Sequence, residues 1–171
     1  MFETMHHANG VGLAANQVGS LDRVIVIDIT DAEERKHEGV GEAADRLHPQ
    51  SDHQPKKFAL INPEVIAEEG SWKMEEGCLS IPDIRDEIER AEKVIVRYKD
   101  LEWRTHEVEA EGLLGRVILH EIDHLNGVLF IDRLGTVKRK LLRGRLNKIE
   151  NGLVDVSYPV MTARDLVAAS K

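Results

Sequence analysis

The segment His120–His124 (HEIDH) combines two histidines and a glutamate at a spacing that suits a metal centre. In a helix, His120 and His124 lie on one face, about 5–6 Å apart, and can share one ion. Glu121 can then reach a water molecule that the ion activates. Two uncoordinated histidines in a core are the plain alternative, but burying polar groups without partners is costly. The pattern therefore predicts metal-assisted hydrolysis.

A third ligand is needed, because catalytic zinc-type sites usually take three from the protein. No histidine follows His124, and Asp132 is the one carboxylate shortly downstream. Upstream lies Cys78, the single cysteine of the chain, directly after Gly77, which permits a tight backbone approach. A lone cysteine is most often a buried inert thiol. The candidates are a Cys/His/His set with an open fourth position and a set completed by the downstream carboxylate.

A helix must position the histidines, and Glu111–Leu125 has the apolar pattern of a buried one. Asn126 and Gly127 form a typical helix stop. The β-branched run Arg23–Ile29 predicts a buried strand. The other predicted elements are an ordered segment at Phe58–Asn62 that ends before Pro63, strands at Glu89–Tyr98 and Glu102–Ala110, and a helix at Val137–Ile149. Strands followed by a central buried helix indicate an α+β fold.

The length of 171 residues predicts a single domain over 1–171 with a core of its own. The net charge of −8 and the few aromatic side chains argue against broad nucleic-acid binding, so we expect no DNA partner. No apolar run approaches the ~18–20 residues that span a bilayer, and no secretory signal is visible. One cysteine excludes an intrachain disulfide and fits a reducing compartment. We therefore expect a cytoplasmic protein with no membrane partner.

Residues 31–57 carry charges of both signs and almost no large apolar side chains, which predicts a long solvated loop or insertion. Three of the eight histidines, His37, His48 and His53, lie in this segment. Their irregular spacing favours a mobile loop over a metal site. Residues 151–171 are predicted to form an irregular tail.

Three motifs resemble those of the peptide deformylase family, in the same order along the chain. They are Gly10–Gln17 (GVGLAANQ), Glu76–Ser80 (EGCLS) and His120–His124. Together they are far more specific than any one of them, and the resemblance covers nearly the whole chain. Compared with the family, the chain is expected to lack the usual N-terminal ~30 residues, whose absence would uncover apolar surface.

The resemblance implies removal of the formyl group from the N-terminal formylmethionine of newly synthesised polypeptides, with release of formate. It implies small mixed or antiparallel β-sheets packed around the central helix, plus a C-terminal helix. It also implies one divalent metal ion, natively Fe²⁺ and replaceable by Zn²⁺, Ni²⁺ or Co²⁺. The ligands carried over are Cys78, His120 and His124.

Carried over in the same way, Glu121 is the general acid/base, while the side chain of Gln17 and the backbone N–H of Leu79 are the oxyanion donors. The substrate-binding residues implied are Val11, Gly12, Glu76, Gly77, Leu113 and Val117.

Two positions depart from the family pattern. Arg116 stands beside the implied methionine pocket, where other members have an apolar residue; its stem could cover the pocket, or the side chain could face solvent. Asn16 replaces a proline found in many members, with no clear consequence.

Basic residues are concentrated near the C-terminus: seven of 23 lie between Arg133 and Lys148. A solvated helix face is the plain explanation. In some family members, however, the C-terminal helix docks on the ribosome. The charge asymmetry therefore supports ribosome contact by residues 137–150 as a hypothesis.

Two other functions remain open. A zincin-like metallopeptidase would take its third ligand downstream of the helix. A non-catalytic, metal-stabilised ribosome-associated module would need a closed site, usually with four protein ligands, and the sequence offers three good candidates.

Overall fold

The computed structural model describes residues 1–30, 56–162 and 165. Within these residues the chain divides into two compact units, Met1–Trp72 with Glu89–Val128, and Lys73–Ile88 with the chain from Leu129 onward. None of the described helices has the length and apolar character needed to cross a membrane. The two units are compact parts of the chain, and one catalytic domain over residues 1–171 remains a prediction.

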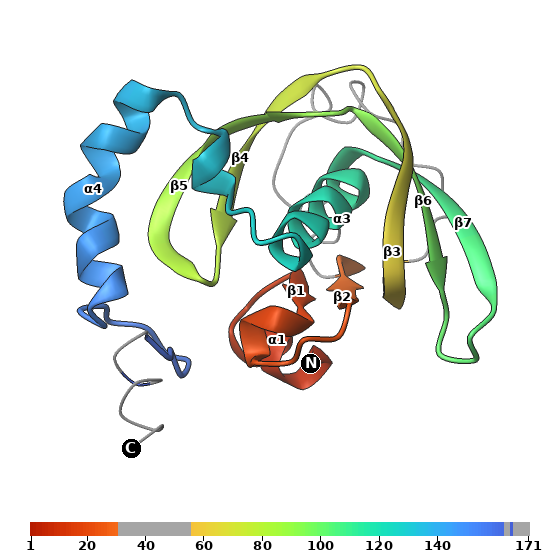
Figure 1. Ribbon diagram of the computed structural model, residues 1–171, viewed down its shortest axis with the longest axis horizontal. Coiled ribbons are helices and arrows are strands. Elements are labelled where there is room, and N and C mark those ends of the chain that lie inside the picture. Colours follow the sequence, from red (N-terminus) through yellow and green to blue (C-terminus); the bar gives the residue numbers. More distant parts are fainter. Residues whose placement is uncertain (31–55, 163–164, 166–171) are drawn as a thin grey trace. The chain divides into compact units, whose positions relative to one another are not determined.

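The first unit is built on a five-stranded sheet with the strand order β1-β2-β3-β6-β7 (Figure 1). Each neighbouring pair is antiparallel, with Leu13 opposite Val26 and Val96 opposite Val108. The strands are β1 (Gly12–Ala14), β2 (Val24–Asp28), β3 (Lys57–Glu69), β6 (Lys93–Lys99) and β7 (Thr105–Glu111), and the helices are α1 (Phe2–His7), η1 (Ala15–Val18) and α3 (Gly112–Leu125).

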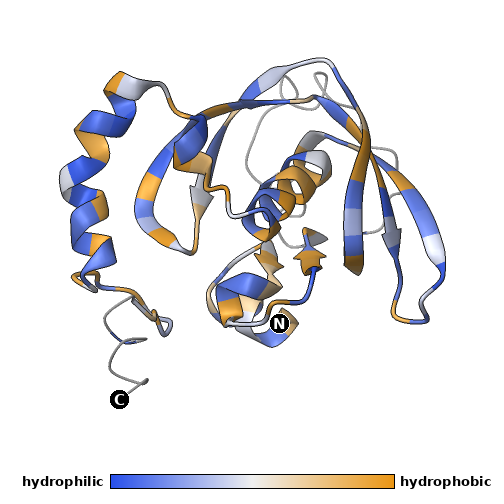
Figure 2. Ribbon diagram, in the orientation of Figure 1, coloured by the Kyte–Doolittle hydropathy of each residue, from blue (hydrophilic) through white to orange (hydrophobic). Residues whose placement is uncertain are grey.

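Helix α3 packs against the sheet and is buried along most of its length, as its composition predicts. Figure 2 shows how hydrophobic residues dominate this helix. Its end at Asn126, with Gly127 in the left-handed region (φ 74°), confirms the predicted stop. The core combines residues of the helix and the sheet: Ile25, Ile27, Leu60, Val94, Val96, Leu114, Ile118 and Ile122.

The sequence suggested that the ordered segment ends before Pro63. Strand β3 instead continues through this proline to Glu69. Proline lacks a backbone N–H, so a continuous ladder requires an irregularity at this point. The pairing of β3 with β6 indeed shifts register between Ile61 and Glu64. Asn62 has a φ of 51° and donates its N–H to the carbonyl of Arg23 rather than to β6. A bulge thus accommodates the proline inside one long strand.

The two strands predicted at Glu89–Tyr98 and Glu102–Ala110 are present with shifted bounds. Glu89 and Arg90 end the preceding strand, and β6 begins only at Lys93. The turn that follows is longer than predicted, because the carboxylate of Asp100 accepts the N–H groups of Glu102 and Arg104 and delays β7 until Thr105.

The second unit contains most of a two-stranded sheet, β4 (Trp72–Cys78) with β5 (Ile81–Arg90), followed by η2 (Phe130–Arg133) and α4 (Thr136–Glu150). Its core is separate from that of the first unit and contains Ile84, Ile88 and Phe130. Half-buried leucines of α4 pack against it, although no residue of that helix is fully buried. Antiparallel strands and few helices confirm the predicted α+β class.

The predicted insertion at 31–57 lies outside the described residues except at its end, where Lys57 already belongs to β3. His37, His48 and His53 fall outside them as well. Residues 151–162 contain no helix or strand, in line with the predicted irregular tail.

We expect Gly115→Ala and Gly144→Ala to change stability in opposite directions. Both glycines lie inside helices, where alanine is favoured by roughly 1 kcal/mol. A Cβ at Gly115 would stand 2.9 Å from the backbone oxygen of Ala110, so α3 or β7 must shift, whereas a Cβ at Gly144 meets nothing within 4 Å. Urea unfolding should show a lower midpoint for the first variant and a higher one for the second. Shifts of the same sign would contradict the close approach of α3 to β7.

Candidate metal centre

The two histidines of the HEIDH segment lie one turn apart on α3 and face each other. Their Nε2 atoms are 3.2 Å apart, their ring centroids 4.9 Å apart, and both residues are buried. At this separation both nitrogens could reach one ion, because metal–nitrogen bonds are ~2.0–2.1 Å long. The pair therefore fits a shared divalent ion, as the spacing predicted.

Glu121 is buried beside the histidine pair, with 5% of its surface exposed. Strand β1 passes so close that a Cβ on Gly12 would stand 2.5 Å from Oε1 of Glu121 and 2.7 Å from Cγ1 of Val117. Any residue with a side chain at position 12 would have to displace this carboxylate. Gly12 is thus required for the close packing of β1 against Glu121. A glycine can serve in the same way where the backbone approaches a ligand closely.

The motif that begins at Gly10 continues from β1 into η1, where two amide side chains are anchored. The N–H of Ala14 donates to Oε1 of Gln17 at 2.8 Å, which orients the amide of Gln17. The Nδ2 of Asn16 donates to the backbone carbonyl of His124 at 2.5 Å. Asn16, which had no assigned role, therefore contacts the last turn of α3, where backbone carbonyls lack partners within the helix.

Asp123 forms an ion pair that sequence reasoning missed. Its Oδ2 accepts a hydrogen bond from Nη1 of Arg90 at 2.6 Å, and the arginine side chain is 1% exposed. A carboxylate inside an apolar helix requires a partner, and this requirement was the available signal. The identity of the partner was not readable, because Arg90 is far away in sequence. The pair fixes the side of α3 next to the histidines.

The three residues of the implied methionine pocket, Val11, Leu113 and Val117, all pack in the core cluster of the first unit. Arg116, beside them, does not face solvent: it is 3% exposed. Its guanidinium lies 4.8 Å from the ring centre of Trp72 and donates to the Trp72 carbonyl at 2.9 Å. Stacking on an aromatic face and a backbone hydrogen bond explain how a charged residue is accommodated there.

In the second unit, the motif around Cys78 ends β4 and forms the turn to β5. The Sγ atom of Cys78 accepts the N–H of Ser80 at 3.4 Å, and the preceding Glu76 is buried. A Cβ on Gly77 would be 3.2 Å from the side chain of Arg85, so this glycine is also closely packed. The turn thus holds the sulfur in a defined position.

Two further contacts of the second unit concern predicted residues. Tyr158 donates its hydroxyl to the carbonyl of Leu79 at 2.8 Å. Burial raises the pKa of Tyr158, and the charges of Cys78 and Asp83 raise it further.

The downstream carboxylate Asp132 accepts the N–H of Leu129 at one oxygen and pairs with Arg139 at the other. Both of its oxygens are thus engaged, which disfavours Asp132 as a metal ligand.

The structure therefore places the predicted residues in two groups. The first unit brings Gly12, Val117, Glu121 and the histidine pair together around α3, with Gln17 in the adjoining η1. The second unit carries the cysteine motif on one turn. A helix that carries two facing histidines and a buried glutamate directly after the first of them is typical of metal-dependent hydrolases.

Comparison with known proteins identifies the family. The Polypeptide deformylase profile matches residues 1–140. The peptide deformylase of Salinibacter ruber is 45% identical over 172 residues, covering 100% of this chain and 83% of the relative, and that of Cytophaga hutchinsonii is 42% identical over 159 residues, covering 92% and 78%. The crystal structure of a peptide deformylase from Legionella pneumophila matches with a TM-score of 0.70 and 38% identity, over 90% of this chain and 78% of that one. The chain belongs to the polypeptide deformylase family.

We expect Arg90→Met to lower the free energy of unfolding by about 3–5 kcal/mol, because Asp123 then stays buried without its guanidinium. Urea unfolding measures the loss. The double variant Arg90→Met/Asp123→Leu should recover most of it, since apolar residues of similar volume often replace a buried ion pair without penalty. A double variant as unstable as the single one would show that the side chain of Arg90 matters for packing and not for charge.

Proposed function

We propose that Cys78, His120 and His124 bind one divalent metal ion, with which the protein hydrolyses the formyl group of N-formylmethionyl polypeptides. As a member of its family, the protein is a metal-dependent hydrolase in the N-terminal processing of nascent chains. The observation that supports the proposed site best is the facing histidine pair beside the buried carboxylate of Glu121.

The ligand chemistry supports this set. One thiolate and two imidazoles, which Cys78, His120 and His124 would supply, suit Fe²⁺, Zn²⁺, Co²⁺ and Ni²⁺. The N–H of Ser80 stabilises negative charge on the sulfur of Cys78. We infer Fe²⁺ as the native ion from the family, and metal analysis of protein purified without oxygen tests that choice. The bound ion supplies Lewis-acid chemistry and makes a water molecule nucleophilic at neutral pH.

Glu121 is proposed to move the proton. Its carboxylate accepts a proton from the attacking water and then delivers it to the amine of the departing methionine. The backbone of Gly12 closes one side of this carboxylate, and Val117 lies beside the same contact. Because these groups leave little room around Oε1, Glu121 is held in one orientation and shielded from bulk water.

Two donors are proposed for the oxyanion that forms when water adds to the formyl carbon. Gln17 is the first donor, and its amide oxygen accepts the N–H of Ala14, which holds the amide group in one orientation. The backbone N–H of Leu79 is the second donor. Removing one such donor typically lowers kcat by about 10²–10³-fold.

Selectivity for methionine is assigned to Val11, Leu113 and Val117, which offer apolar surface for an unbranched thioether side chain. Because Arg116 is held by Trp72, its charge is compensated next to these residues. Gly12, Glu76 and Gly77 are proposed to bind the substrate backbone, to which two glycines permit close approach.

The role of Glu121 is tested with Glu121→Gln, which keeps the size of the side chain. Formate release from formyl-Met-Ala-Ser should fall by about 10²–10⁴-fold, because amide cannot accept and return the proton. Metal content and circular dichroism should remain those of the wild type. Full activity in this variant would contradict the proposed role.

Cys78→Ala serves as the companion variant, and it should lose metal and activity together. Metal content equal to wild type would instead favour a zincin-like metallopeptidase, which would also cleave unformylated peptides. A metal-binding protein that releases no formate would favour the non-catalytic module.

We further propose that α4 contacts the ribosome, which places the protein in the cytoplasm beside its substrate. Some basic side chains of α4 are used within the second unit: Lys138 hydrogen-bonds Asp86 and lowers its pKa, Arg139 pairs with Asp132, and Arg145 bonds the carbonyl of Asp83. Others are exposed and form no ion pair with any described residue: Lys140, Arg143 and Lys148. Exposed Val137 and Leu141 add apolar surface to the same helix.

Reversing the charges of Lys140, Arg143 and Lys148 to Glu should weaken ribosome binding and reduce its salt dependence, because fewer phosphates are neutralised. Co-sedimentation at several salt concentrations measures both. The control reverses Lys93, Arg97 and Arg104, which gives the same net charge far from α4 in the sequence. Equal binding by the two triple variants would contradict contact through α4.

A further inference from the structure

The chain after α4 returns to the turn that carries Cys78 within the second unit. Helix α4 ends with Gly152 in the left-handed region, and the N–H of Leu153 bonds back to the carbonyl of Lys148. The family profile ends at residue 140, so the tail beyond this helix lies outside the part that defines the family.

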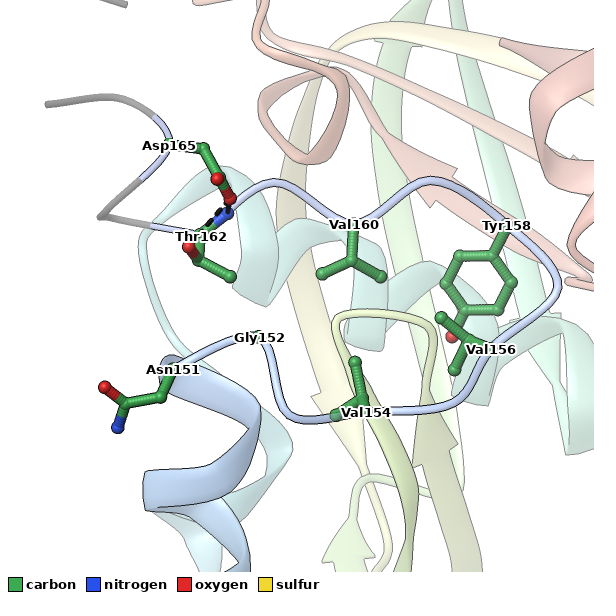
Figure 3. Close-up of a pocket in the computed structure, with 8 residues that line it drawn as sticks. All are labelled: Asn151, Gly152, Val154, Val156, Tyr158, Val160, Thr162 and Asp165. Carbon is green, nitrogen blue, oxygen red and sulfur yellow. Dashed lines mark hydrogen bonds between the residues drawn. The ribbon is translucent and has the colours of Figure 1, made fainter. Parts of the chain in front are cut away.

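The tail folds back on itself and forms a loop. Figure 3 shows the side chains of Val154, Val156, Tyr158 and Val160 converging on the inside of a loop. They line a cavity of about 430 Å³, and Thr162 closes the other end through its N–H and hydroxyl bonds to Asp165. Tyr158, one of the lining residues, is half-buried.

From this position the hydroxyl of Tyr158 donates to the carbonyl of Leu79 at 2.8 Å. The acceptor lies in the two-residue turn between β4 and β5, directly after Cys78. Inside the same turn, Ser80 donates to the sulfur of Cys78. The turn is thus held by a bond of its own and by one from the distant tail.

We propose that Tyr158 is a positioning residue: it holds the Leu79–Ser80 peptide through the Leu79 carbonyl and so limits rotation of the Leu79 backbone, on whose other side the N–H lies. The inference rests on the proposed function, in which the N–H of Leu79 stabilises the oxyanion. A donor of this kind must point at the developing charge, so a change in the backbone torsions of Leu79, which redirects its N–H, lowers kcat more than it raises KM. Tyr158 itself touches neither substrate nor metal in this proposal.

Tyr158→Phe tests the proposal, because it removes one hydroxyl and keeps the ring in the loop. Loss of the hydrogen bond should lower kcat for formyl-Met-Ala-Ser about three- to tenfold, with KM changed less than twofold. In the Co²⁺-substituted protein, the thiolate-to-cobalt absorption band should shift, because the turn that holds Cys78 is then less constrained.

Thr162→Val is the matched control. It removes one hydroxyl hydrogen bond from the same tail, at a residue that bonds Asp165 and not the turn. Its kcat and cobalt spectrum should equal those of the wild type, even if the melting temperature falls. If both variants lose stability equally and neither changes kcat or the spectrum, the role of Tyr158 is only structural and the proposal is overturned.

Formate release by the wild-type protein distinguishes a failure of this proposal from a failure of the proposed function. A wild-type protein that releases no formate would overturn the function, and the cobalt spectra of the two variants would still decide the role of Tyr158. An active wild type with an unchanged Tyr158→Phe variant would overturn the role of Tyr158 alone.

Discussion

Burial of four polar residues within five positions of α3 is the constraint on which the first unit depends. His120, Glu121, Asp123 and His124 are all buried in a helix whose other residues are largely apolar. Each of these groups would destabilise the fold if it were left without a suitable neighbour. The ion pair with Arg90 supplies the partner for Asp123, and the metal ion that we propose would supply one for the two histidines. The chemistry of the site and the stability of its helix are therefore linked.

The positions of glycines show how closely this helix is enclosed. Gly12 lets β1 approach the carboxylate of Glu121, and Gly115 lets α3 approach the end of β7. Both glycines serve contact between elements rather than flexibility. Strand β1 of the sheet thus limits the space around the proposed general base, so the surroundings of Glu121 are part of the packing of the first unit.

Much of this was readable from the sequence, because it depends on local pattern. The period of apolar residues revealed α3, and the i, i+4 spacing of His120 and His124 revealed the facing pair. What sequence could not give were contacts between distant segments: Arg90 with Asp123, Arg116 with Trp72, and Tyr158 with Leu79. Pro63 misled the strand prediction, since a bulge accommodates it without ending β3.

The bond from Asn16 to the carbonyl of His124 has a consequence for local opening. It joins η1 to the last turn of α3, and Arg23 adds a second bond to the carbonyl of Leu125 at 3.3 Å. Ends of helices normally fray first and exchange their amide hydrogens fastest. Here fraying of the C-terminal turn of α3 also requires the bonds from Asn16 and Arg23 to break. Amide hydrogens in the histidine-bearing turn should therefore exchange more slowly than those at an ordinary helix end.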